Sequence, residues 1–433
     1  MSARLQESLL HHEPAKHTST LLLLSHAGTK IGSKGWQFVV PLLLLRFTPG
    51  GDDMSAPALY GLAVFIATFV FGPAVGGWMD RTPRWRVVQA GIFLQTVAVV
   101  GALLVLYMLT TAQAEAPKHE LTKLPWALLM AMILCGVVEG LGALVSSVTV
   151  KKDWVPTVWD AADPALTTIN TAMANIDLMA EILGPLAAGA ALAYLGGVLG
   201  FVAVGAANAG SFVIELGLLR AVLDRNPRLA APKPAPRQAD APSKGVCAKL
   251  GAICENWPVF ARQPSGVPLL VITYSLLYFT VLSPHGVVLT AYLQTRNVTP
   301  PQLAVFRAAG AAAGVAGMTG FRILATRLGL RAMAAVHLWL QAVCVVAASA
   351  SFYATQSTDG LSSAMFAFLA LVVVSRYGLC AGRPLEMRCP LEMRCPTWQS
   401  RRPLADDGGH SPQVRFRPRQ PAAPADLGRR DGP

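Results

Sequence analysis

Long apolar stretches, separated by short polar connections, fill this chain from Thr18 to Leu379. Each stretch holds about 20 residues, the length that an α-helix needs to cross a hydrocarbon core of ~30 Å. The pattern predicts an all-α polytopic membrane protein with ten spanning helices: Thr18–Phe47, Ala56–Trp78, Val87–Leu109, Leu124–Val150, Ala165–Leu195, Leu199–Leu219, Val267–Leu293, Leu303–Ala325, Ala332–Phe352 and Leu361–Leu379.

The composition and the placement of charge support a membrane assignment. Hydrophobic residues make up 53% of the chain and charged residues 14%, against about 25% charged in soluble domains. The net charge of +12 comes mainly from the connections after the second, fourth, sixth and eighth spans. The positive-inside rule places these connections, and both termini, in the cytoplasm of a plasma membrane or endomembrane protein. The basic charge therefore sets topology, and we expect no nucleic-acid partner.

A long connection divides the spans into six and four. It covers 224–263, and its Pro- and Ala-rich part, Leu229–Gly245, is typical of a disordered cytoplasmic linker. Six spans, a basic linker and further spans form the layout of a two-bundle transporter of the major facilitator type. We predict a cytoplasmic segment at 1–17, a six-helix bundle at 18–223 and a partial four-helix bundle at 264–380.

The chain changes character after Leu379. The hexapeptide PLEMRC occurs twice in tandem, at 384–389 and 390–395, and no helical period follows it. We expect 381–433 to be a disordered tail. One interpretation is a frame-shifted or mis-spliced gene end.

A polar stripe interrupts the fifth predicted span. Asn170, Asp177 and Glu181 are spaced i, i+7 and i+11, which places them on one face of a helix. A carboxylate in hydrocarbon costs at least roughly 2.5 kcal/mol, so it usually faces an interior cavity and pairs with a cation or a proton. We interpret this stripe as part of a cation site.

Neighbouring spans carry further polar residues at a similar depth. With a rise of about 1.5 Å per residue, Gln95, Asn208 and Glu215 fall with Asp177 in one slab at the membrane midplane or just cytoplasmic of it. Carboxylate and amide oxygens suit hard or borderline divalent cations. Helix–helix hydrogen bonds are the alternative role for Gln95 and Asn208.

Two spans contain sequences that weaken a helix. The seventh contains Ser283–Gly286 (SPHG), and the first contains Gly28, Gly32 and Gly35. Broken helices at corresponding positions of two halves indicate a substrate site, whereas a simple kink is the alternative. His285 at the second break is a candidate ligand, because imidazole suits Fe²⁺, Co²⁺ and Zn²⁺.

The connection after the second span carries a candidate gate. Residues 76–84 fit the facilitator pattern G-x-x-x-D-R-x-x-R, in which Asp80 at a helix end can pair with arginines such as Arg84. That pairing would lock the cytoplasmic face closed. The alternative is an ordinary basic loop with a solvated ion pair, worth about 1 kcal/mol or less.

The sequence offers nothing that indicates an enzyme. It has no His/Cys cluster, nucleotide-binding P-loop or nucleophile elbow. Its seven cysteines include no C-x-x-C pair, and none lies in a predicted external loop. We therefore expect neither a catalytic cofactor nor a disulfide framework.

Short motifs in these spans carry a family resemblance. They are Gly32–Phe38 (GSKGWQF), Tyr60–Leu62 leading into Gly77–Asp80, Lys152–Trp154, Ile169–Thr171, Ile176–Asp177, Ile182–Pro185, Trp257–Pro258, Leu277–Leu282 and Arg376–Leu379. Over about residues 20–379 the set resembles the ferroportins, the cellular iron exporters.

The resemblance implies a twelve-helix facilitator that exports Fe²⁺, with a metal site in each half. Asp177 would carry over as a metal ligand of the N-terminal half. Gln95, Asn208 and Glu215 would match a neighbouring site that animal members use for Ca²⁺. Asp153 and Asn170 would match the cytoplasmic gate.

This sequence also departs from the family. Ser33 stands where animal members have an acid in the first helix, which weakens a Ca²⁺ site. His285-Gly286 replaces an Asp-Cys pair, and Glu181 replaces an amide, adding a carboxylate to the stripe. The family's eleventh and twelfth helices have no counterpart in this sequence.

We therefore predict a secondary transporter that moves Fe²⁺ out of the cytosol by alternating access, with the metal ion as substrate. Asp177 and His285 would bind the metal, and Asp80 with Arg84 and Asp153 with Asn170 would form the cytoplasmic gate. Two alternatives stay open. One is a facilitator for a small organic cation whose ammonium pairs with Asp177. The other is a non-transporting remnant with a truncated second bundle.

Overall fold

The computed structural model contains helices joined by short connections. It describes residues 2–48, 53–115, 123–159, 164–233, 269, 272, 283, 286–328, 330–356 and 360–380. Among these residues the regular secondary structure is entirely helical, as the sequence predicts. The described helices all belong to one unit, residues 1–384.

The first six predicted spans all form helices. The helices of this half are α1 (Ser2–Phe47), α2 (Ser55–Arg81), α3 (Arg84–Glu115), α4 (Lys123–Val148), the π-helix η1 (Thr149–Trp154), α5 (Val155–Val158), α6 (Pro164–Leu195), α7 (Gly197–Arg225) and α8 (Pro227–Ala230). The fourth span is longer than the predicted Leu124–Val150, because the helical chain continues from α4 through η1 into α5.

The second half is described in part. Its helices are α11 (Val287–Thr295), α12 (Pro300–Leu328), α13 (Leu330–Thr355) and α14 (Ser363–Cys380), which match the end of the seventh span and the eighth to tenth spans. Most of the seventh span, His285, the linker from 234 to 263 and the tail 381–433 lie outside the described residues.

The helices have the properties of membrane spans. Seven of the described helical segments are long and apolar enough to cross a bilayer, and Ser363–Leu379 is a shorter apolar helix. Large apolar side chains are exposed on α2, α3 and α13, including Phe69, Phe93 and Trp339. Exposed apolar surface of this extent suits a hydrocarbon environment.

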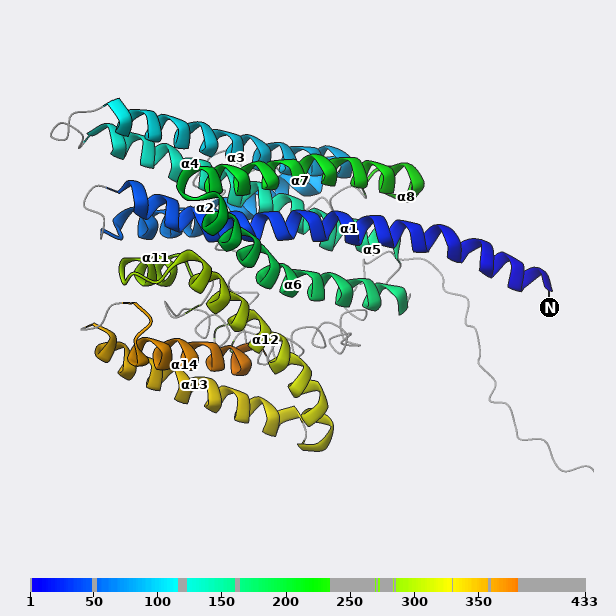
Figure 1. Ribbon diagram of the computed structural model, residues 1–433. Helices are drawn as coiled ribbons and strands as arrows, with labels where there is room; N and C mark the ends of the chain where they lie inside the picture. The colour runs from blue at the N-terminus through cyan, green and yellow to red at the C-terminus, as the bar shows by residue number, and fades with distance from the viewer. Residues whose placement is uncertain are drawn as a thin grey trace, which may run out of the picture. The chain divides into compact units, whose positions relative to one another are not determined.

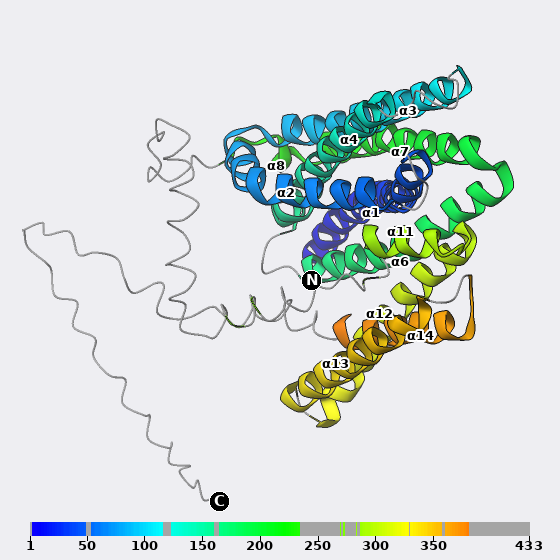
Figure 2. The same cartoon turned by 90° about the vertical axis from the view of Figure 1, so that its left-hand side faces the viewer.

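Helices α1 and α6 occupy the centre of the packing. Figures 1 and 2 both show α3, α4 and α7 on one side of α1, with α12, α13 and α14 on the other. Helix α1 packs against α6 and α7, and α12 packs against α6 and α14. The two halves therefore meet along α6 and α12.

Helix α1 is unbroken, which corrects the expectation of a break at its glycines. Gly35 instead lies against α6, where a methyl group added at Gly184 would be 2.8 Å from the Gly35 nitrogen. A methyl group at Gly32 would be 2.8 Å from the Asn208 side-chain oxygen on α7. The glycines let three helices approach closely, as small residues do in membrane bundles. In the seventh span, α11 begins directly after Gly286, which is not helical.

Candidate metal site and cytoplasmic gate

Asp177 on α6 is held between two basic side chains from different elements. Nε2 of His26 on α1 lies 2.9 Å from Oδ1 of Asp177. Nζ of Lys151 on η1 donates to the other carboxylate oxygen. The Asp177 side chain is 30% exposed and His26 is 6% exposed, so the carboxylate is reachable while the imidazole is enclosed. Lys151 supplies the positive charge that neutralises this carboxylate.

The pair of Asp177 and His26 has the chemistry of a partial metal site. A carboxylate oxygen and an imidazole nitrogen suit borderline divalent ions. In the described part of the chain, no three His, Cys, Asp or Glu side chains form a group that could hold a metal ion. A metal at Asp177 would therefore complete its coordination with water, amide or hydroxyl oxygens.

His26 is not among the site residues predicted from the sequence. A signal was present, since His26 is an ionisable residue inside a predicted span, and such residues usually have a function. Its relation to Asp177 is invisible in the sequence because the two residues are 151 positions apart.

Glu215 on α7 lies close to the Asp177 group. Ser146 on α4 donates its hydroxyl to Oε1 of Glu215 at 3.3 Å. Lys30 on α1 donates to the hydroxyl of Ser147 at 3.4 Å, and its charge interacts with both Asp177 and Glu215. The fold thus gathers two of the predicted carboxylates around one lysine.

Asn208 and Gln95 are both deeply buried but differ in their bonding. The Asn208 amide has no hydrogen-bond partner for either atom among the described residues, and neither has Oε2 of Glu215. Buried oxygens without partners fit a cation of the Ca²⁺ type. Gln95 instead donates to the Gly91 carbonyl of its own helix at 3.3 Å. Ser33 is also buried. The Ca²⁺ site stays a prediction.

The other two members of the stripe differ from Asp177. Glu181, one turn further along α6, forms an ion pair of 2.6 Å with Lys34 of α1. Asn170, two turns nearer the start of α6, is exposed. The stripe therefore combines two ion-paired carboxylates with an exposed amide.

The predicted gate residues pair differently from the expectation. Nε of Arg84 lies 2.8 Å from Oδ1 of Asp153 on η1, and Nζ of Lys233 lies 2.8 Å from Oδ2. Arg84 therefore pairs with Asp153, while Asp80 is exposed and Asp153 is engaged by cations instead of by Asn170. Lys233, which is not among the residues predicted from the sequence, follows α8 within the linker.

The start of the linker is bound to the same group. Arg84 donates to the Ala231 carbonyl at 2.9 Å, and Lys233 donates to the Met79 carbonyl at 2.8 Å. A cavity of about 550 Å³ lies beside these contacts, lined among others by Asp80, Trp85 and Leu229. The contacts fasten the linker to the turn between α2 and α3.

The π-helix joins the two charged groups. Lys151 and Asp153 are two residues apart on η1, one paired with Asp177 and the other with Arg84 and Lys233. π-Helical turns are rare and occur frequently at functional sites. One short helical turn therefore connects Asp177 to the ion pairs of Asp153.

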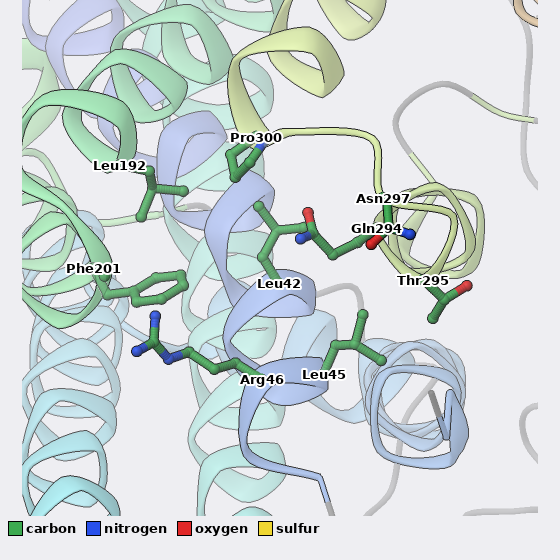
Figure 3. Close-up of a pocket in the computed structure, with 10 residues that line it drawn as sticks. Leu42, Leu45, Arg46, Leu192, Phe201, Gln294, Thr295, Asn297 and Pro300 are labelled. Atoms are coloured by element: carbon green, nitrogen blue, oxygen red, sulfur yellow. The ribbon is translucent and has the colours of Figure 1, made fainter. Parts of the chain in front are cut away.

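A second cavity lies at the other end of α7, near the residue where that helix begins. It measures about 400 Å³ and is lined by residues of α1, α6, α7 and α11 and by the turn before α12. Figure 3 shows the Arg46 guanidinium extended toward Phe201, with Gln294 and Pro300 on the other side of the cavity.

The sequence matches a known family over most of its length. The Ferroportin1 (FPN1) family model matches residues 16–383. A protein named Ferreportin from Bdellovibrio bacteriovorus is 32% identical over 370 residues, covering 83% of this chain and 78% of that protein. Ferroportin from Homo sapiens is 25% identical over 389 residues, covering 80% of this chain and 66% of that protein.

Solved structures agree with the sequence match. A bacterial homologue of the iron transporter ferroportin in the inward-facing state superposes with a TM-score of 0.69 at 30% identity, covering 88% of this chain and 86% of that one. The outward-facing state gives 0.60, covering 87% and 84%. The helices described above therefore have the two-bundle facilitator fold, and they superpose better on the inward-facing than on the outward-facing homologue.

Proposed function

Because this chain belongs to the ferroportin family, a family of transporters and not of enzymes, we propose that it carries Fe²⁺ across a membrane, from the cytosol outward, by alternating access. The observation that carries this proposal is the group of Asp177, His26 and Lys151. It offers an anionic and an imidazole ligand side by side, inside a helix bundle. The identity of the metal is inferred from the relatives, since the superposed structure is that of a bacterial homologue of the iron transporter ferroportin.

Metal binding in this proposal is an exchange of cations. Without metal, the Lys151 ammonium neutralises Asp177, so the carboxylate does not stand alone at membrane depth. An arriving divalent ion takes the carboxylate, and Lys151 moves away. The His26 Nε2, which donates its proton to Asp177 in the empty site, releases that proton to water and then binds the ion. The lysine returns when the metal leaves, so the empty site again has a counter-charge.

Lys151 also links binding to the gate. Its displacement would shift η1, which carries Asp153, the residue bound by Arg84 and Lys233. Such a shift would strengthen or release the contacts that fasten the linker to the turn between α2 and α3. Metal occupancy and the cytoplasmic gate are in this way coupled through one helical turn.

Efflux of radiolabelled iron and cobalt tests the function. We expect cells or vesicles with the wild-type protein to export both metals. Asp177→Ala should lower the rate of metal efflux at least about tenfold. Asn175→Ala, an exposed polar position on the same helix, is the matched control and should keep wild-type flux.

Two outcomes contradict the proposal. Equal metal flux from Asp177→Ala and the wild type would remove the metal role of Asp177. Flux of a small organic cation that depends on Asp177, with no metal flux, would favour the organic-cation carrier.

A further inference from the structure

Glu181 connects cations from both halves of the protein. Its pair with Lys34 of α1, at 2.6 Å, is largely enclosed, with side chains 21% and 26% exposed. Arg307 of α12 lies over the ring of Phe38, one turn after Lys34 on α1, and its charge interacts with Glu181. Charged side chains from three helices, α1, α6 and α12, therefore lie around one region of α1.

Arg307 is placed to hold the halves together. It is 4% exposed, and its guanidinium carbon lies 5.4 Å from the centre of the Phe38 ring on α1. A charged arginine at membrane depth is costly and normally requires a carboxylate, carbonyl or aromatic partner. Arg307 belongs to the second half, whereas Phe38 and Glu181 belong to the first.

The helices around this group form a tight seam. A methyl group added at Gly189 would be 2.6 Å from Cβ of Ala304 and 3.3 Å from the Pro300 carbonyl. Gly189 is eight residues after Glu181, on the same face of α6, and Ala304 is three residues before Arg307 on α12. The seam and the charges thus belong to one contact between α6 and α12.

The 400 Å³ cavity of Figure 3 lies at the outer end of this seam. Leu192 of α6 and Pro300 of α12 belong to its lining, and each is about one turn of its helix away from Gly189 and Ala304 respectively. The seam therefore separates this cavity from Glu181. If α6 and α12 parted, the cavity would extend inward toward the charged group.

We propose that Glu181 is a positioning residue of an external gate, which Arg307 closes from the second half and Lys34 orients from the first. The inference rests on the proposed transport function and gives Glu181 a role other than the metal-ligand role expected from the sequence. The better superposition on an inward-facing homologue agrees with a gate closed on the external side.

Thiol labelling tests the gate without any metal. Ala304→Cys, at a position 1% exposed, is the reporter in a protein whose seven native cysteines are replaced by alanine. A membrane-impermeant maleimide is applied from the side opposite the termini. Glu181→Gln should increase the labelling rate roughly tenfold. The ion pair with Lys34 that it removes is partly enclosed, so its strength should lie between that of an exposed pair and that of a fully buried pair. Asn175→Ala on the same helix is the control and should label at the parent rate.

Two further variants test the partners. Arg307→Met and Lys34→Met should each accelerate labelling, and Glu181→Gln combined with Arg307→Met should be no faster than Glu181→Gln alone, because both remove one interaction. Size-exclusion profiles establish that each variant is folded. Labelling within about twofold of the control in both Glu181→Gln and Lys34→Met would overturn the gate.

The result is separable from the transport function. Faster labelling of Glu181→Gln in a protein that moves no iron would support the gate and contradict the proposed function. Iron flux that depends on Asp177, together with unchanged labelling of Glu181→Gln, would support the proposed function and contradict the gate.

Discussion

Lys151 occupies the position in which a bound cation would neutralise Asp177, so the two compete for one carboxylate. His26 is different, because it is enclosed and can stay beside Asp177 when the lysine leaves. The two residues therefore have opposite expected effects on metal affinity. Lys151 opposes binding, and His26 adds a ligand.

Replacing Lys151 with methionine removes the competitor. We expect the apparent KM for Fe²⁺ to fall about fivefold, the equivalent of an ion pair of about 1 kcal/mol. Turnover should fall as well, because the empty carboxylate loses its counter-charge and metal release becomes slower. Initial rates of radiolabelled iron transport in vesicles, measured against concentration, give both values.

Lys152→Met is the control for this experiment, since Lys152 is the exposed neighbour on the same π-helical turn. It should leave KM and turnover unchanged. A KM that rises in Lys151→Met would contradict the exchange of cations.

Replacing His26 with alanine removes the nitrogen ligand. Imidazole binds Fe²⁺ and Co²⁺ better than Mn²⁺, so transport of the first two metals should weaken by about tenfold, more than that of manganese. His17→Ala, at an exposed position of α1, should change none of them. Competition of unlabelled metals against iron flux measures the preference, and an equal loss for all three metals would indicate a structural role for His26.

At the scale of secondary structure, glycine positions decide how closely the helices approach. Gly184 on α6 faces the α1 backbone, and a methyl group there would be 2.8 Å from the Ile31 carbonyl. The backbone cannot move aside as the end of a flexible side chain can. Gly210 on α7 has nothing within 4 Å of the same added group.

Alanine substitutions at these two glycines should have different effects on the free energy of unfolding. Gly184→Ala should destabilise the protein by about 1–3 kcal/mol through overpacking. Gly210→Ala should be neutral or stabilising by up to about 1 kcal/mol, since alanine is the better helix former. Thermal unfolding in detergent, followed by intrinsic fluorescence, measures both. A Gly184→Ala protein as stable as the wild type would show that α1 and α6 pack less closely than the structure has them.

At the scale of the whole molecule, the basic connections and the charged contacts of Arg84 lie at the same end of the helices. The Arg84, Asp153 and Lys233 group belongs to the side that the positive-inside rule assigns to the cytoplasm. The turn at Leu361, between α13 and α14, belongs to the other side. Transport out of the cytosol requires this orientation.

Labelling of single cysteines tests the orientation. Leu361→Cys, at a position 42% exposed, should react with an impermeant maleimide in intact cells. Cys247 and Cys254 of the linker should react only after the membrane is permeabilised. The reverse result would invert the topology and turn the proposed exporter into an importer.

The sequence by itself determined the helical spans, their division by a basic linker and the presence of acidic residues within α6. These features are local, because hydrophobic length and helical spacing depend on neighbours along the chain. Only the tertiary structure decided which charges meet. His26 and Asp177 are 151 residues apart, and Arg84 and Asp153 are 69 apart. Such pairs form because membrane helices bury charges against whichever opposite charge the packing brings near. The same packing set Arg84 beside Asp153 instead of Asp80, and Glu181 beside Lys34.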